Sequence, residues 1–176
     1  MKNVLFLLLC LLIAGCTNGA LSREDYLKLK NSKIVFPKNM EQFSNIKVAK
    51  LQTAYKMLVF RDSLACTPCY VKSLDEWKTF VSAFRSNRLS LIFVLVPKQE
   101  EYLSVRSVLR ARKYDWTILV DKENAFEKTN PQMPKDGIYH CVLLDKNNKV
   151  VLIGNPLRNK KAFNMMIDLV NGNINN

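Results

Sequence analysis

The stretch that decides the fold is YKMLVFRDSLACTPCY, residues 55–70. Its first part, residues 55–61, is apolar and rich in aromatic and branched side chains, which predicts a strand. Apolar side chains at helical spacing from Tyr70 to Arg85 predict a helix. Cys66 and Cys69 therefore lie where a strand turns into a helix. Two such thiols can close a local disulfide, and the positive end of a helix favours a thiolate. Redox chemistry is the leading hypothesis.

The N-terminus indicates where this chemistry takes place. An unbroken apolar run from Val4 to Ala14 is shorter than the roughly 20 residues of a membrane span and fits a secretory signal. It leads into Leu12-Ile13-Ala14-Gly15-Cys16, which resembles the bacterial lipobox. That resemblance implies a lipoprotein signal peptide over residues 1–15 and lipid on Cys16. We expect a lipid-anchored protein of the cell envelope that faces the periplasm from the inner or outer membrane. An ordinary signal peptide with a chance cysteine is the alternative.

The cysteine inventory follows from export. Five cysteines are present, of which Cys10 leaves with the signal peptide and Cys16 carries lipid. Disulfides persist outside the cytoplasm, so we expect Cys66 and Cys69 to be oxidised unless a partner reduces them. Cys141 is left over, and we expect it to be a small core residue.

The charge balance limits the classes of partner. The chain carries a formal net charge of +12, and its basic residues are spread along the sequence. A solvated basic surface is the simplest interpretation, and attraction to anionic lipid head groups comes next. We expect no nucleic acid partner for an exported protein.

The sequence predicts one domain over residues 34–176, after a polar tether over residues 16–33 in which Ser22 caps a short helix. Predicted strands cover residues 34–36, 46–51, 55–61, 90–96, 116–120, 138–144 and 150–153. Predicted helices cover residues 70–85, 99–113, 124–128 and 159–170. The turn Asp145 to Lys149 makes the last two strands a hairpin.

This order of elements, the Cys66-Thr67-Pro68-Cys69 motif and the hairpin of residues 142–156 resemble the thioredoxin-like family. The resemblance runs from about Ile46 to Val170 and is greatest to exported, membrane-anchored lipoproteins of the Bacteroides type. It implies an α/β fold: a thioredoxin-like three-layer sandwich with a central mixed β-sheet flanked by helices and a C-terminal hairpin and helix. It also implies a membrane-anchored thiol-disulfide oxidoreductase without a cofactor. Its partners would be the thiols or disulfides of exported proteins and an upstream redox partner.

The family mechanism assigns roles within the motif. Cys66 would be the exposed attacking thiolate, and Cys69 would sit one turn inside and resolve the mixed disulfide. Pro68 fits the first helical turn, where no amide partner is needed. Thr67 and Pro68 would set how oxidising the pair is.

Three positions depart from the family pattern. Ala65 replaces a tryptophan, Phe60 stands where a buried carboxylate often lies, and Tyr139 occupies the position of the family's cis-proline. A cis bond before a residue other than proline costs about 3 kcal/mol, so we expect a trans bond before Tyr139. Beside it stands His140, the one histidine of the chain. Our hypothesis is that it lies near Cys66 and favours the thiolate when protonated; an ordinary strand histidine is the alternative.

Other functions compete with the oxidoreductase. A zinc site would need Cys66, Cys69, His140 and Cys141 together, but neighbours on a strand face opposite sides, so we expect no metal. A non-catalytic binding module that keeps the fold is the second hypothesis. A copper metallochaperone is the third, because such carriers use two cysteines at a longer spacing and a distant histidine.

Overall fold

The computed structural model describes residues 22–43, 51, 53–64, 66–84, 88–112 and 114–172. The strands are β1 (Glu41–Phe43), β2 (Tyr55–Arg61), β3 (Leu89–Leu95), β4 (Thr117–Val120), β5 (Cys141–Asp145) and β6 (Val150–Ile153). The α-helices are α2 (Arg23–Leu29), α3 (Thr67–Lys72), α4 (Trp77–Ser82), α5 (Tyr102–Ala111), α6 (Ala125–Thr129) and α7 (Lys160–Asn171). Short 3-10 helices are η2 (Leu74–Glu76), η3 (Gln99–Glu101) and η4 (Gly137–Tyr139).

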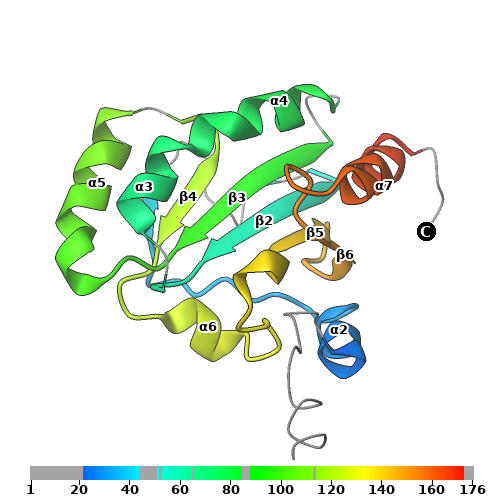
Figure 1. The fold of residues 1–176 in the computed structure, drawn as a ribbon, viewed down its shortest axis with the longest axis horizontal. Helices are drawn as coiled ribbons and strands as arrows, with labels where there is room; N and C mark the ends of the chain where they lie inside the picture. Colours follow the sequence, from blue (N-terminus) through cyan, green and yellow to red (C-terminus); the bar gives the residue numbers. More distant parts are fainter. Residues whose placement is uncertain are drawn as a thin grey trace, which may run out of the picture.

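The described strands form one mixed sheet in the order β1-β4-β3-β2-β5-β6 (Figure 1). The central strand β2 pairs in parallel with β3 along its whole length, from Tyr55 opposite Leu89 to Arg61 opposite Leu95. On its other side β2 pairs antiparallel with β5, and β5 forms the C-terminal hairpin with β6. The loop from β2 to α3 therefore starts from the middle of the sheet.

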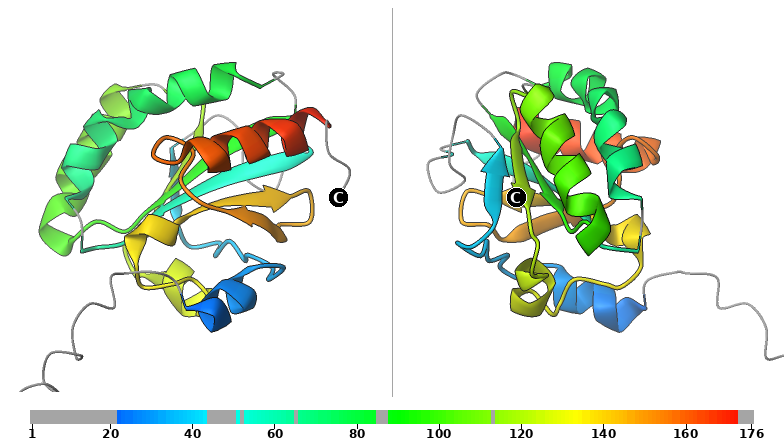
Figure 2. Two further views of the ribbon diagram at one scale, coloured as in Figure 1. Left: turned by 45° about the vertical axis from the view of Figure 1, so that its right-hand side comes forward. Right: turned by 90° about the vertical axis from the view of Figure 1, so that its left-hand side faces the viewer.

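Helices cover both faces of this sheet. The helices α3, α4, α5 and α7 lie on one face, and α2 and α6 lie on the other (Figures 1 and 2). Side chains alternate along a strand, so Met57 and Val59 of β2 pack beneath α3 and its neighbours while Leu58 and Phe60 pack toward α6. The predicted α/β three-layer sandwich with a mixed sheet is confirmed, as are the hairpin and the last helix.

The predicted helix from Tyr70 to Arg85 is wrong in its start and its continuity. The structure starts α3 at Thr67 and ends it at Lys72, and the backbone N–H of the C-cap residue Ser73 donates to the Tyr70 carbonyl at 2.9 Å. The short helix η2 then precedes α4. The apolar spacing continues through this break, because Leu74 and Trp77 are buried in the core on the α3 face of the sheet.

Two other predicted boundaries also change. The strand expected from residue 138 begins at Cys141, because residues 137–139 form η4. β1 was not predicted, and the predicted strand 46–51 lies outside the described residues except for Leu51.

Part of the predicted tether belongs to the domain. Ser22 caps α2 as expected, since its hydroxyl accepts the Asp25 backbone N–H at 3.0 Å. Leu29 of α2 is fully buried, and the Asn31 backbone N–H donates to the Val150 carbonyl at 3.0 Å. Within the described residues, folded structure therefore extends into the expected tether, back to Ser22. Residues 16–21 lie outside the described residues. None of the described helices is long and apolar enough to cross a membrane.

A buried amide fastens the segment after α2 to α6. The Asn130 side chain is fully buried, and its Oδ1 accepts the Val35 backbone N–H at 2.8 Å. Its Nδ2 donates to the carbonyls of Val35 at 2.9 Å and Phe126 at 2.8 Å. These bonds join the backbone at Val35 to the end of α6, which lies far from it in the sequence.

We expect Asn130→Ala to lower the free energy of unfolding by about 1–3 kcal/mol, because it removes buried hydrogen bonds and leaves buried polar groups unpaired. Gln132→Ala is the matched control. Its amide donates one exposed bond of 3.2 Å to the Lys33 carbonyl, so we expect a loss of under about 0.5 kcal/mol. Urea unfolding of both variants with the disulfide intact measures the difference. Equal losses would contradict the role of Asn130.

Candidate redox site

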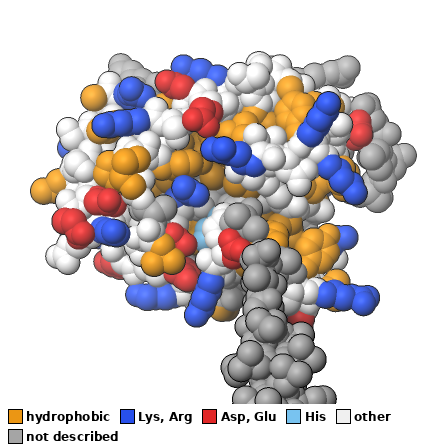
Figure 3. All heavy atoms as spheres, viewed as in Figure 1, with side chains coloured by type: hydrophobic (Ala, Val, Ile, Leu, Met, Phe, Trp, Pro, Cys, Tyr) orange, Lys and Arg blue, Asp and Glu red, His pale blue; other side chains and the backbone are white. Residues whose placement is uncertain are grey.

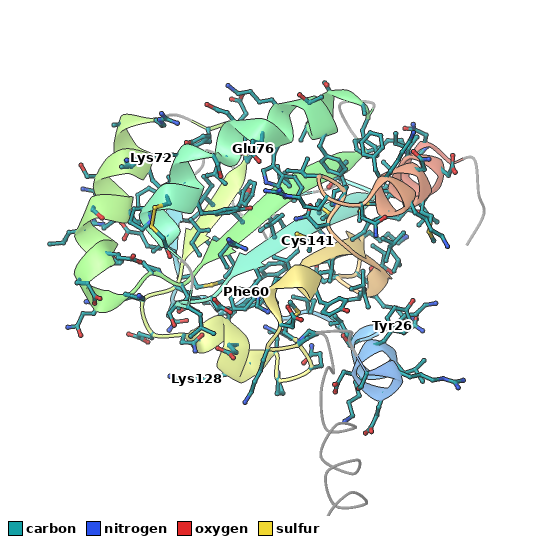
Figure 4. All side chains as sticks on the ribbon, in the orientation of Figure 1. Tyr26, Phe60, Lys72, Glu76, Lys128 and Cys141 are labelled. Carbon is teal, nitrogen blue, oxygen red and sulfur yellow. A yellow bond between two sulfur atoms is a disulfide. The ribbon has the colours of Figure 1, made fainter. Side chains whose placement is uncertain are left out.

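The cysteine pair is a disulfide at the start of α3 (Figure 4). The Cα atoms of Cys66 and Cys69 lie 5.4 Å apart. Cys66 is the N-cap residue, and its Sγ accepts the Cys69 backbone N–H at 3.3 Å. Both cysteines are exposed, so the expected position of Cys69 inside the protein is wrong. The helix turns Thr67 and Val71 toward the sheet instead and leaves both sulfurs at the surface.

The two residues between the cysteines have different surroundings. Pro68 is half-buried in the first turn of α3, as expected. Thr67 has an exposed fraction of only 1%, and its Oγ1 has no hydrogen-bond partner among the described residues. A buried hydroxyl without a partner is unfavourable, and this one belongs to a residue between the two cysteines in the sequence.

His140 makes its contacts on the face of α6. Its ring lies 4.7 Å from the Phe60 ring, which in turn lies 5.0 Å from that of Phe126. The Nε2–H donates to the Pro134 carbonyl at 2.6 Å, and Nδ1 lies 4.0 Å from Asp62 Oδ2. Burial lowers the pKa of His140. The described contacts therefore tie it to Phe60, Pro134 and Asp62 rather than to Cys66, and its protonation is disfavoured.

Cys141 faces the other way. It belongs to the core beneath α3, and it is a free, buried thiol. Burial raises the pKa of its thiol to about 12, so it remains protonated near neutral pH. The expectation of a small core residue agrees with this environment.

The four side chains proposed as metal ligands do not converge. His140 and Cys141 face opposite sides of the sheet, and the pair lies at the surface. Among the described residues no group of three or more histidine, cysteine or acidic side chains could hold a metal ion. The described contacts of His140, with Phe60, Pro134 and Asp62, include neither cysteine, so they give no support to a copper carrier.

Tyr139 ends η4 next to the redox loop. Every peptide bond of the described residues is trans, including the bond before Tyr139, which confirms that expectation. The following residue, His140, accepts the Phe60 backbone N–H through its carbonyl at 2.8 Å. Tyr139 therefore stands at the end of β2 from which the loop to Cys66 leaves.

Sequence reasoning missed Arg61. It follows Met57 and Val59 in the alternation of β2, so its side chain lies under α3, whereas Phe60 points to the opposite face. The guanidinium carbon lies 4.4 Å from the Tyr70 ring centroid. The sequence could have indicated this position, because Met57, Val59 and Arg61 alternate along β2 and so share one face.

The surface near the pair contains an exposed leucine and, further away, a groove. Leu64, two residues before Cys66, has an exposed fraction of 84%. A groove of about 550 Å³ lies between α4 and the start of α7, and neither cysteine lines it. Its floor contains Phe80 and Phe163, and Arg158, among others, lines it. Figure 3 shows hydrophobic side chains on this face with basic ones beside them.

Comparison with known proteins identifies the fold. No protein-family model and no curated protein matches the chain. The solved thioredoxin domain of a thiol-disulfide oxidoreductase from Bacteroides vulgatus is 14% identical, with a TM-score of 0.54 over 80% of this chain and 97% of that one. A putative thiol:disulfide interchange protein DsbE from Chlorobium tepidum is 17% identical, with a TM-score of 0.54 over 80% and 96%. A thioredoxin-like superfamily protein is 15% identical, with a TM-score of 0.56 over 81% and 96%. The chain has a thioredoxin-like fold.

The buried histidine predicts a pH dependence of stability. Because the pKa of His140 is lowered in the folded state, the unfolded chain binds more protons as the pH falls below about 6.5, and stability is lost in that range. We expect the free energy of unfolding to fall more steeply from pH 7.5 to 5.5 in the parent protein than in His140→Gln. Urea unfolding at each pH measures this. Parallel pH profiles would contradict a buried neutral imidazole.

Proposed function

We propose that the protein is a membrane-anchored thiol-disulfide oxidoreductase that acts on exported proteins through Cys66 and Cys69. The observation that carries the proposal is an exposed disulfide at the strand-to-helix junction of a thioredoxin-like fold. So short a disulfide loop restricts the unfolded chain little, so a purely structural role explains neither its position nor its exposure. The oxidoreductase named among the similar structures supports the same chemistry.

The exchange would proceed in two steps. A substrate thiolate attacks the Sγ of Cys66, the bond to Cys69 breaks, and its electron pair leaves on the Cys69 sulfur. A second thiolate of the substrate then attacks the substrate sulfur that is bonded to Cys66, the substrate disulfide forms, and Cys66 leaves as a thiolate. The substrate loses two electrons and two protons and gains a disulfide, while the pair is reduced. The reverse sequence reduces a substrate disulfide, and the potentials of the partners set the direction.

We expect Cys66→Ser to lower the rate of thiol-disulfide exchange by at least about a hundredfold, because it removes the attacked sulfur. Reduction of insulin with dithiothreitol and oxidation of a reduced substrate protein in a glutathione buffer test both directions. Cys69→Ser should accumulate a mixed disulfide at Cys66, which non-reducing electrophoresis detects.

Cys141→Ser is the matched control, because it removes a buried thiol outside the motif. It should keep most of the activity. Equal rates for Cys66→Ser and the parent protein would reject the enzyme. They would leave the binding module as the function, for which the groove between α4 and α7 provides a surface that does not use the pair.

The membrane anchor is the second part of the proposal. It rests on the lipobox-like sequence before Cys16, which lies outside the described residues. With lipid on Cys16, α2 would be joined to the membrane through a short segment. The redox domain would then meet its substrates within reach of the membrane surface.

In a bacterium that processes lipoproteins, the parent protein should incorporate a labelled fatty acid and sediment with membranes. We expect Cys16→Ala to lose the label, because this change removes the modified sulfur. Cys10→Ala, within the expected signal peptide, is the control and should keep the label. Label that remains in Cys16→Ala would contradict the anchor.

A further inference from the structure

The inner side of α3 carries a cation. Arg61 stacks its guanidinium on the Tyr70 ring at 4.4 Å. Tyr70 directly follows Cys69, and its backbone N–H donates to the Cys66 carbonyl at 3.2 Å. Residues four apart on a helix lie on one face, so Tyr70 connects Arg61 to the side of the helix on which Cys66 lies.

Among the described residues, no acidic side chain forms an ion pair with Arg61. Its buried Nε also has no hydrogen-bond partner among them. The adjacent carboxylate of Asp62 is engaged elsewhere, since Oδ1 accepts the Leu64 backbone N–H at 3.0 Å and Oδ2 faces His140. A buried charged donor without an acceptor is costly.

The charge of Arg61 reaches the groups around the pair. Burial, with smaller contributions from the Cys141 thiol and Glu76, raises the pKa of Tyr70. The charge of Arg61 acts in the opposite direction. It also opposes the effect of burial on the pKa of Cys141 and adds to the effect of burial on His140. Tyr70, Cys141 and His140 therefore all lie within the range of the Arg61 charge.

A second donor without a partner lies in the first turn of α3. Thr67 Oγ1 is buried and unpaired between the two cysteines in sequence. The disulfide carries no charge and is a weak acceptor, whereas reduction creates a thiolate, which is a strong one. In the disulfide form, Arg61 Nε and Thr67 Oγ1 thus have no acceptor among the described residues.

We propose that Arg61 is a positioning residue that stabilises the thiolate of Cys66 in the reduced pair and thereby makes the disulfide a stronger oxidant. Stabilising the reduced form shifts the equilibrium toward reduction of the pair, which means oxidation of its substrate dithiols. This inference rests on the proposed function and refines it. It shifts the balance toward substrates that carry reduced cysteines.

The test compares Arg61→Met with Arg88→Met. Both remove one positive charge, but Arg88 precedes β3 at the far end of the sheet and donates to the Asn171 carbonyl at 3.4 Å. The equilibrium with a glutathione buffer gives the potential of the pair. The pH dependence of Cys66 alkylation by iodoacetamide, measured on the reduced protein, gives the thiolate population.

We expect Arg61→Met to lower the equilibrium constant for reduction of the pair by glutathione about tenfold, which is about 30 mV for this couple. The alkylation profile should move to higher pH. Arg61→Lys should shift both quantities less, because it keeps the charge without the planar donor. It also serves as the test variant if Arg61→Met does not fold. Arg88→Met should match the parent protein.

Unchanged profiles in the Arg61 variants would overturn the inference, and so would equal shifts in Arg61→Met and Arg88→Met, which would show a general effect of net charge. The alkylation measurement requires no turnover. An inactive pair whose alkylation still depends on Arg61 would reject the proposed function alone, and an active pair without that dependence would reject this inference alone.

Discussion

The position of β2 between β3 and β5 is the constraint on which the site depends. Parallel pairing with β3 requires a crossover connection, and such crossovers are right-handed, which places α3 and α4 together on one face. Antiparallel pairing with β5 brings the His140 carbonyl to the Phe60 N–H at 2.8 Å. The loop to Cys66 thus starts where β5 begins, although about 80 residues separate the two segments in the chain.

The alternation of side chains along β2 and at the start of β5 then places the reactive side chains on two opposite faces of the sheet. Phe60 and His140 fall on the face of α6, where burial disfavours a charged imidazole. Arg61 and Cys141 fall beneath α3. The histidine that appeared the natural partner of the thiols is therefore directed away from them, and the positive charge under the redox helix comes from an arginine.

The sequence predicts the central features because they have strong local signals. The strand at 55–61, the hairpin around residues 145–149 and the cysteine pair at the strand-to-helix turn all stand as expected. The break after Ser73 is different, because the apolar spacing through Leu74 and Trp77 continues regardless of it. β1 was missed because three half-buried residues at a sheet edge show no pattern. The burial of Leu29 depends on tertiary packing that no local signal reports.

Both sulfurs are exposed, so solvent access does not decide which cysteine reacts. The charges around each sulfur must decide it. In the proposed exchange the second step releases Cys66, and a better stabilised thiolate leaves more readily. Cys66 already accepts the Cys69 backbone N–H through its sulfur, and it lies on the side of α3 that Tyr70 shares with Arg61. These contacts favour Cys66 as the resting thiolate of the reduced pair. The proposed role of Cys66 as the attacking thiolate would thus have an electrostatic basis, even though Cys69 is exposed as well.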